Sequence, residues 1–184
     1  MENDKILVIK INKLIEQLKL QIQILQIQIQ ILLLRKKLTI PNLPKPSYII
    51  IHHGGGNWNF QQVNESHKNR WGFKSSLGYY IGYQYFIEYS GKVYQGRADN
   101  EEGAHTVGNV PYYYNKNSIG ICLQGNMEIE KPTVAQLKSL KELVNKKQLE
   151  YNISNQRTIG HREVSNTLCP GKYLWNELIR LYPS

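Results

Sequence analysis

The chain has 184 residues, 41% of them hydrophobic and 10% aromatic, and a formal net charge of +9. This length fits one globular domain with an appendage, and two cysteines are too few for a disulfide framework. The positive charge favours anionic partners without separating nucleic acid from anionic lipid or cell-wall polymers. Because the basic residues are scattered and no nucleic-acid-binding signature occurs, we expect no nucleic-acid partner.

Residues 1–38 are rich in Ile, Leu, Gln and Lys and contain neither Gly nor Pro. Apolar residues fall at the a and d positions of successive heptads: Val8, Ile11, Ile15, Leu18, Ile22, Leu25, Ile29 and Leu32. Because Ile at a and Leu at d favour a parallel two-stranded coiled coil, we predict a homo-oligomer formed through this segment. Further apolar residues off this seam (Leu20, Ile24, Ile27 and Ile31) and the alternation of Gln with Ile leave alternatives open. These are a strand, or a helix packed on the domain or on a membrane surface.

The first residues, MENDKILVIKINK, contain no evident signal peptide, because no basic start precedes an uninterrupted apolar core and a cleavage site. The most apolar run, ILQIQIQILLL, is interrupted by glutamines and is shorter than the ~18 apolar residues that a membrane span needs. We therefore expect no transmembrane span, and a signal-anchor is the alternative.

Three prolines in TIPNLPKPS predict a linker at residues 39–46, followed by a domain over residues 47–184. Strand patterns and helix patterns alternate along this domain. Strands are expected within residues 47–53, 83–96, 117–125 and 157–160, and helices within residues 59–72, 132–147 and 170–182. The interleaving indicates an α/β fold with one mixed central sheet flanked by helices.

The helix expected within residues 132–147 is amphipathic. Thr133 is a candidate N-cap, and Val134, Leu137, Leu140 and Val144 share its apolar face.

The stretch GHREVSNTLCP carries His161 and Cys169, two residue types that bind zinc. A third ligand is available at the end of the apolar strand SYIIIHH, where His52 or His53 can reach the cleft at the carboxyl end of the sheet. Two histidines and one cysteine leave the fourth zinc position open, which is the arrangement of catalytic sites. Cys122, inside SIGICLQG, is expected to be a small buried hydrophobe.

Five motifs occur in a fixed order, IIIHH, GYQYFIEYSGKVYQGR, GAHTVGN, NSIGICLQG and GHREVSNTLCPG. Together, over residues 46–182, they resemble the type-2 N-acetylmuramoyl-L-alanine amidases and peptidoglycan recognition proteins, including bacteriophage lysozyme-type amidases. The resemblance implies the fold of that family, a zinc cofactor and hydrolysis of the amide between N-acetylmuramic acid and L-alanine in peptidoglycan. Since no signal peptide is evident, we expect an endolysin-like protein that stays in the cytoplasm until it is released onto the bacterial cell wall. The alternative is a non-catalytic module that binds peptidoglycan.

The resemblance assigns the metal to His52, His161 and Cys169. It assigns substrate binding to His105 of GAHTVGN and to Asn115 of YNKNSIG.

For catalysis, the resemblance points to Tyr83 and Thr167, whose hydroxyls can donate hydrogen bonds to a developing oxyanion. The chain departs from the family at two places. Gln84 replaces a histidine that follows the tyrosine, and Thr167 stands where phage enzymes carry a lysine, so the residue that protonates the leaving amine is not assigned. Glu163 is expected either to orient a ligand or to be an exposed glutamate.

Overall fold

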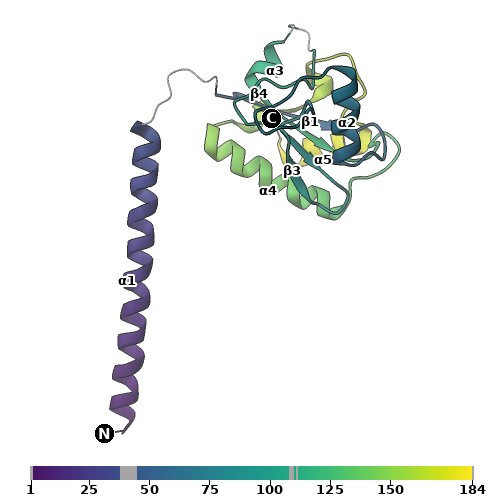
Figure 1. Ribbon diagram of the computed structural model, residues 1–184. Helices are drawn as coiled ribbons and strands as arrows, with labels where there is room; N and C mark the ends of the chain where they lie inside the picture. The colour runs from purple at the N-terminus through teal and green to yellow at the C-terminus, as the bar shows by residue number, and fades with distance from the viewer. Residues whose placement is uncertain (1, 38–44, 108–109, 111, 184) are drawn as a thin grey trace. The chain divides into compact units, whose positions relative to one another are not determined.

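The computed structural model describes residues 2–37, 45–107, 110 and 112–183 (Figure 1). The chain divides into two compact units, Met1–Leu43 and Pro44–Ser184. In the first unit, side chains are described for residues 10–31. Residues 39–44 of the predicted linker lie outside the described residues.

The described residues of the first unit form one helix, α1 (Glu2–Lys37), so the predicted helix is confirmed and the strand alternative is wrong. All its described side chains are exposed. The apolar residues off the predicted seam form a second row with 4–3–4 spacing and exposed fractions of 45–58%: Leu20, Ile24, Ile27 and Ile31. At about 100° per residue, this row lies nearly opposite the a and d positions. Thus α1 has two apolar faces, and the coiled coil stays a prediction.

None of the helices in the described part of the chain combines the length and the hydropathy needed to cross a membrane.

The second unit is built on a five-stranded sheet with the order β3-β2-β4-β1-β5. The strands are β1 (Tyr48–His53), β2 (Tyr85–Ile87), β3 (Val93–Gln95), β4 (Ser118–Leu123) and β5 (Thr158–Gly160). All neighbours are parallel except β2 and β3, which are antiparallel. This mixed sheet confirms the predicted fold class. The two central strands, β4 and β1, are almost continuously buried, as is usual for strands covered on both faces.

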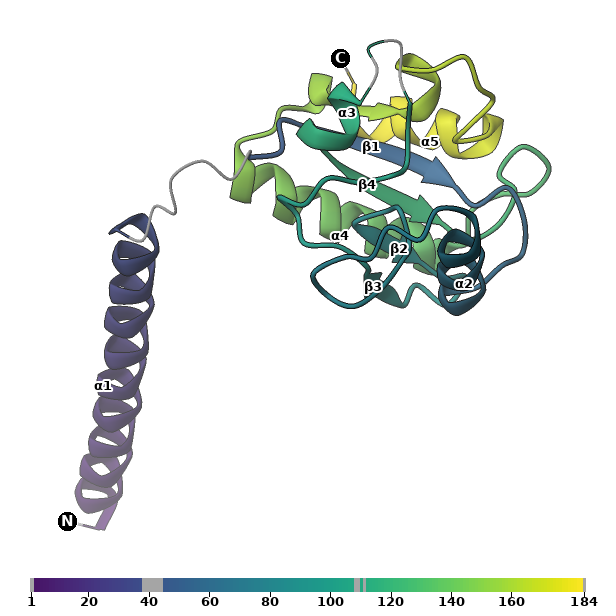
Figure 2. The ribbon, with the colours of Figure 1, turned by 45° about the horizontal axis from the view of Figure 1, so that its top comes forward.

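Helices cover both faces of the sheet (Figure 2). On one face, α4 (Val134–Tyr151) and α5 (Lys172–Leu181) pack on a cluster that includes Ile49 and Ile51 of β1. On the other, α2 (Phe60–Arg70) packs on a smaller cluster that includes Cys122. Because successive strand residues point to opposite faces, His52 lies on the face of α2. The short helix α3 (Tyr113–Asn117) directly precedes β4.

The predicted cap of α4 is confirmed, because the Thr133 hydroxyl accepts a hydrogen bond from the Gln136 N–H at 3.0 Å. Val134, which shares the apolar face of α4, is not buried, because its side chain is 86% exposed. The buried residues of this helix are Gln136, Leu140, Val144 and Lys147. The two polar residues among them can be buried because the Gln136 amide donates to backbone carbonyls and the Lys147 ammonium pairs with Asp99.

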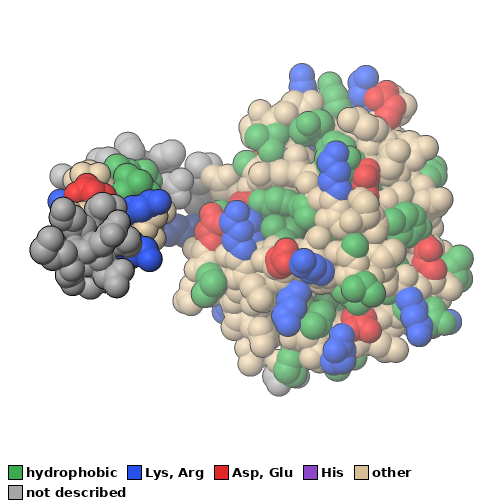
Figure 3. Space-filling view, turned by 90° about the horizontal axis from the view of Figure 1, so that it is seen from below, with side chains coloured by type: hydrophobic (Ala, Val, Ile, Leu, Met, Phe, Trp, Pro, Cys, Tyr) green, Lys and Arg blue, Asp and Glu red, His purple; other side chains and the backbone are tan. Residues whose placement is uncertain are grey.

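On the face drawn in Figure 3, Lys and Arg side chains are interspersed with Asp and Glu side chains. This agrees with the scattered basic residues of the sequence.

Candidate metal centre

Three predicted ligands, far apart in the sequence, lie together in the second unit. One nitrogen each of His52 and His161 and the sulfur of Cys169 all lie within 4.8 Å of one another. The Nδ1 atom of His52 is 3.7 Å from the Sγ atom of Cys169, and the two histidine rings have centroids 4.5 Å apart.

The sheet explains how these residues meet. His52 lies near the carboxyl end of β1, and His161 directly follows β5, the parallel neighbour of β1. The carboxyl ends of parallel strands share one edge of a sheet, which is where ligands usually bind in α/β folds. Cys169 lies on the loop that leads from His161 to α5.

The two adjacent histidines, His52 and His53, make different contacts. His53 is half-buried, and its Nδ1 atom accepts a hydrogen bond from the Met127 N–H at 3.0 Å. Its backbone N–H, however, donates to the Cys169 sulfur at 3.4 Å. Thus the ring of His52 lies at the cluster, and His53 contributes its main chain.

The donor set fits a zinc ion. Zn–N bonds of about 2.05 Å and Zn–S bonds of about 2.3 Å in a tetrahedron put nitrogen and sulfur ligands about 3.6 Å apart. The distance from His52 Nδ1 to Cys169 Sγ, 3.7 Å, is close to that value. Burial lowers the pKa of His52 well below its usual value, with His105 and His161 adding to the effect. Burial also lowers the pKa of His161 to about 4, so both rings stay neutral, the form that binds metals.

The thiol of Cys169 is 8% exposed, and burial raises its pKa to about 12. The hydrogen bond from the His53 N–H acts in the opposite direction and favours the thiolate. A cation beside the sulfur would complete this stabilisation, because a coordinating thiol loses its proton. Cys169 therefore suits a metal site better than it suits free nucleophilic chemistry.

The predicted catalytic tyrosine lies against the cluster. The ring centroid of Tyr83 is 5.1 Å from that of His52. Burial raises the pKa of Tyr83 well above its usual value, so the hydroxyl keeps its proton. Cys122, which pairs with His52 in the register of β1 and β4, is fully buried as expected.

Thr167, the other predicted catalytic residue, lies on the loop that carries Cys169. Its Oγ1 atom accepts a hydrogen bond from the Cys169 N–H at 3.2 Å. Glu163 is exposed, but its carboxylate accepts the Gly160 N–H at 2.7 Å and so holds the turn on which His161 begins.

The residues predicted to bind substrate are both buried. His105 is 8% exposed and Asn115 is 7% exposed. The Nδ1 atom of His105 lies 3.0 Å from His52 Nε2, and the Asn115 side-chain oxygen accepts the N–H groups of His105 and Thr106. Their contact with substrate stays a prediction, because in this structure these polar atoms bond within the protein.

Sequence reasoning missed Thr106, although it stands next to His105 in GAHTVGN. Its Oγ1 atom lies 2.9 Å from His161 Nε2. The sequence also gave no indication of the side-chain contacts of Gln84, which is fully buried. The Gln84 amide accepts the Gly120 N–H and donates to the Glu101 carbonyl, each at 2.8 Å.

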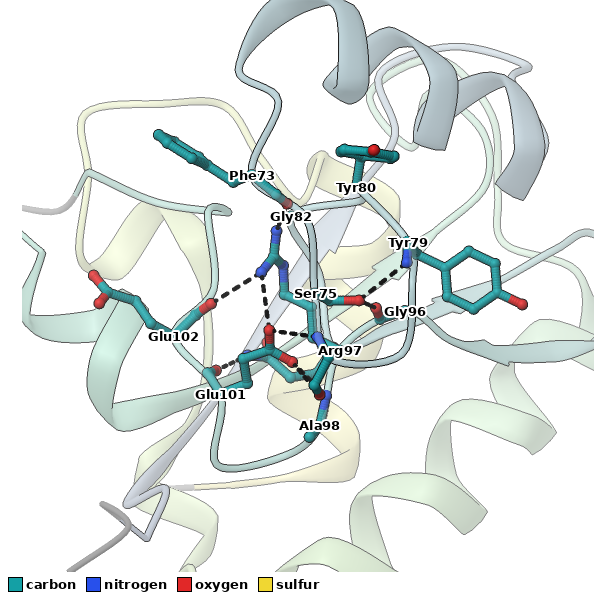
Figure 4. Close-up of polar contacts among 12 residues, drawn as sticks. Phe73, Ser75, Tyr79, Tyr80, Gly82, Gly96, Arg97, Ala98, Glu101 and Glu102 are labelled. Atoms are coloured by element: carbon teal, nitrogen blue, oxygen red, sulfur yellow. Dashed lines mark hydrogen bonds and ion pairs between the residues drawn. The ribbon is translucent and has the colours of Figure 1, made fainter.

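A buried arginine holds the loop that leads to His105 (Figure 4). The Arg97 guanidinium donates to the carbonyls of Ile81 at 2.7 Å and Phe73 at 2.6 Å. It also donates to the Glu102 carbonyl at 3.3 Å and pairs with the Glu101 carboxylate at 3.7 Å. Arg97 thus joins the segment before Tyr83 to the segment before His105.

Known proteins are similar to this chain in sequence and in fold. Residues 42–172 match the family model of N-acetylmuramoyl-L-alanine amidases. Peptidoglycan-recognition protein SC2 of Drosophila melanogaster is 34% identical over 145 residues, which cover 72% of each chain. Peptidoglycan recognition protein 3 of Mus musculus is 32% identical over 151 residues, which cover 77% of this chain and 40% of that protein.

Two solved structures illustrate the similarity in fold. The endolysin N-acetylmuramoyl-L-alanine amidase LysCS from Clostridium intestinale URNW has 30% identity and a TM-score of 0.63, with 75% of this chain and 84% of that chain covered. Drosophila peptidoglycan-recognition protein LB has 29% identity and a TM-score of 0.62, with 78% and 89% covered. A variant of the latter was solved in complex with tracheal cytotoxin. The chain therefore belongs to the N-acetylmuramoyl-L-alanine amidase family, in which both amidases and peptidoglycan-recognition proteins are its relatives.

Proposed function

We propose that residues 47–184 form a zinc-dependent amidase that hydrolyses the bond between N-acetylmuramic acid and L-alanine in peptidoglycan. The observation that carries this proposal is the group formed by His52, His161 and Cys169, whose ligand atoms lie within 4.8 Å of one another. The similarity to an endolysin amidase supports the reaction, and the relatives named for peptidoglycan recognition support the substrate.

When bound at this group, zinc supplies a Lewis acid that polarises a carbonyl and makes water nucleophilic near neutral pH. The neutral rings of His52 and His161 and the sulfur of Cys169 are the donors that would hold it. Tyr83 would donate a hydrogen bond to the developing oxyanion, since burial keeps its hydroxyl protonated. Thr167 would donate a second one, because its oxygen already accepts the Cys169 N–H and its proton can be directed elsewhere.

The second candidate function is a recognition module that binds peptidoglycan without cleaving it. The relatives named for recognition favour this reading. The three metal-binding side chains favour catalysis instead, because binding alone needs neither a thiol nor two neutral histidines in contact. We therefore rank the amidase first.

The proposal includes self-association through α1 and action at the bacterial cell wall after release from the cytoplasm. A membrane-surface helix buries one apolar face in lipid and keeps a polar face in water. The two apolar faces of α1 fit this poorly and fit contact with other copies of the chain better. Residues 1–38 are the proposed assembly segment and residues 39–46 the proposed linker.

The function can be tested on purified cell walls with the full-length protein. Hydrolysis at the proposed bond releases new L-alanine amino termini, which chemical labelling and mass spectrometry identify. The controls are zinc-stripped protein and the Cys169→Ala variant, both expected to release none. If the unmodified protein sediments with cell walls and releases no L-alanine termini, the recognition module is the correct reading.

A further inference from the structure

We infer that His105 and Thr106 act together as a brace in which each residue orients one histidine of the metal centre. This inference rests on the proposed zinc site and assigns positioning roles to residues that need not contact substrate. The two arms of the brace are the contact between His105 and His52 and the contact between Thr106 and His161.

The first arm is a chain of hydrogen bonds in which the donor and the acceptor of each bond can be assigned. The Ser118 hydroxyl donates to the Tyr114 carbonyl at 2.6 Å, and a carbonyl can only accept. The Ser118 oxygen can then accept the Nε2–H of His105 at 3.4 Å, which leaves His105 Nδ1 as an acceptor. That atom accepts the Nε2–H of His52 at 3.0 Å. The chain thus leaves a lone pair on the Nδ1 atom of His52, the atom that faces Cys169.

The ring of His105 is also held sterically. A Cβ atom added to Gly120 would lie 2.5 Å from the Cδ2 atom of His105, and one added to Gly103 would lie 2.4 Å from the same atom. The ring therefore packs directly against the two glycine backbones, where no side chain larger than hydrogen fits. This packing fixes the direction in which His105 Nδ1 points.

The second arm orients the other histidine. The Thr106 hydroxyl lies 2.9 Å from His161 Nε2 and 3.0 Å from the Ser165 hydroxyl. If Thr106 accepts the Nε2–H of His161, its own proton goes to Ser165. His161 Nδ1 then keeps its lone pair for the metal. Second contacts of this kind set the tautomer and orientation of histidine ligands.

One side chain anchors both arms. The Asn115 side-chain oxygen accepts the backbone N–H of His105 and that of Thr106, each at 3.0 Å. The Asn115 backbone carbonyl also accepts the Gly103 N–H at 2.8 Å. Because neighbouring residues on one anchored segment hold both histidines, the ligand geometry can exist before the metal binds.

The test is the affinity for zinc, measured by competition with a chromophoric chelator rather than by activity. His105→Phe keeps a ring between the glycines but removes the acceptor, and Thr106→Val removes the hydroxyl at constant shape. Each should weaken zinc binding about 10-fold to 100-fold. His105→Asn and Thr106→Ser, which retain an acceptor, should bind zinc more tightly than His105→Phe and Thr106→Val.

Thr158→Val is the matched control, because Thr158 is buried and its hydroxyl bonds, among the described residues, with Gln148 and Ser154 rather than with the metal centre. It should lose stability but retain zinc affinity. Unchanged zinc affinity in folded His105→Phe and Thr106→Val proteins would overturn the brace.

A second measurement separates the brace from the enzymatic function. Nitrogen-15 NMR of the unmodified, metal-free protein should find His52 and His161 protonated at Nε2. Protonation at Nδ1 in either residue would overturn the inference. This measurement uses the unmodified protein, so it decides even if the variants do not fold. If the protein binds zinc through these tautomers but releases no L-alanine termini, the brace stands and the proposed amidase function fails.

Discussion

The Nδ1 atom of His52 lies 3.7 Å from the Sγ atom of Cys169, although 117 residues separate them in the chain. The backbone N–H of His53 donates to the same sulfur at 3.4 Å. The end of β1 therefore contacts the cysteine twice, through a side chain and through the main chain. This geometry gives adjacent histidines different roles that can be tested.

We expect His52→Ala to lose bound zinc and His53→Ala to retain most of it. The ring of His52 faces Cys169, whereas the ring of His53 accepts a hydrogen bond from Met127. The backbone N–H that reaches the sulfur is present in either variant. Metal analysis of both purified proteins checks this, and full zinc content in His52→Ala would move the ligand assignment to His53.

Removal of zinc should make Cys169 available to alkylating reagents. A zinc-bound thiolate is coordinated, whereas in the metal-free protein burial raises the pKa of Cys169 to about 12, so its alkylation should accelerate as the pH rises. Cys122, which is fully buried, should stay unmodified with or without a chelator. Mass spectrometry after timed alkylation decides, and equal modification of Cys169 before and after chelation would contradict its role as a ligand.

Tyr83→Phe should lower the rate of peptidoglycan hydrolysis about 100-fold to 1000-fold, the usual effect of removing one oxyanion donor. Zinc content should not change, because the tyrosine contacts the His52 ring without being a ligand. Tyr79→Phe is the control, since Tyr79 packs against the same apolar cluster and on Phe60. Similar rates for the two variants would remove Tyr83 from the mechanism.

The metal-free protein should lose stability as the pH falls from about 6.5 towards 4, in part through His67. Burial lowers the pKa of His67 to about 4, with Arg70 and Arg97 adding to the effect. An unfolded histidine has a pKa of about 6.5. The unfolded state therefore binds more protons in this window, and the free energy of unfolding decreases as the pH falls.

His67→Asn isolates this contribution, because an Asn side-chain oxygen can still accept the Gly82 N–H but does not titrate. Denaturant unfolding at several pH values, with a chelator present, should give a shallower pH dependence for the variant. Identical pH dependence in the two proteins would show that His67 titrates normally in the folded state.

Self-association should depend on α1. Replacement of Ile22 and Leu25 with Gln should give a monomer that still binds zinc, because both residues lie on the predicted seam. Replacement of Ile24 and Ile27 with Gln is the matched variant. It also replaces two apolar residues with Gln, on the second apolar row of α1, and leaves the predicted seam intact.

Sedimentation of the three proteins at micromolar concentration measures these masses. A mass that falls in both variants would mean that both faces of α1 take part in assembly. An unmodified protein that is already monomeric would rule out the coiled coil.

The sequence by itself predicted the order of the strands and of the longer helices, the cap at Thr133 and the candidate ligands His161 and Cys169. These features are local, because a strand, a cap or a short motif is written in residues near one another. It also identified the helix of residues 1–38 as the first choice over a strand. The periodicity of that segment could not decide alone, since alternating Gln and Ile fit both periods.

Only the tertiary structure decided which residues form hydrogen bonds with the candidate ligands His52 and His161. His105 is 53 residues from His52 and Thr106 is 55 residues from His161, so no local pattern records either contact. The exposure of Val134 was likewise decided by where α4 meets the sheet. Periodicity reports which side of an element tends to be buried, whereas hydrogen bonds between distant loops depend on the path of the whole chain, and that path is fixed only when the strands assemble.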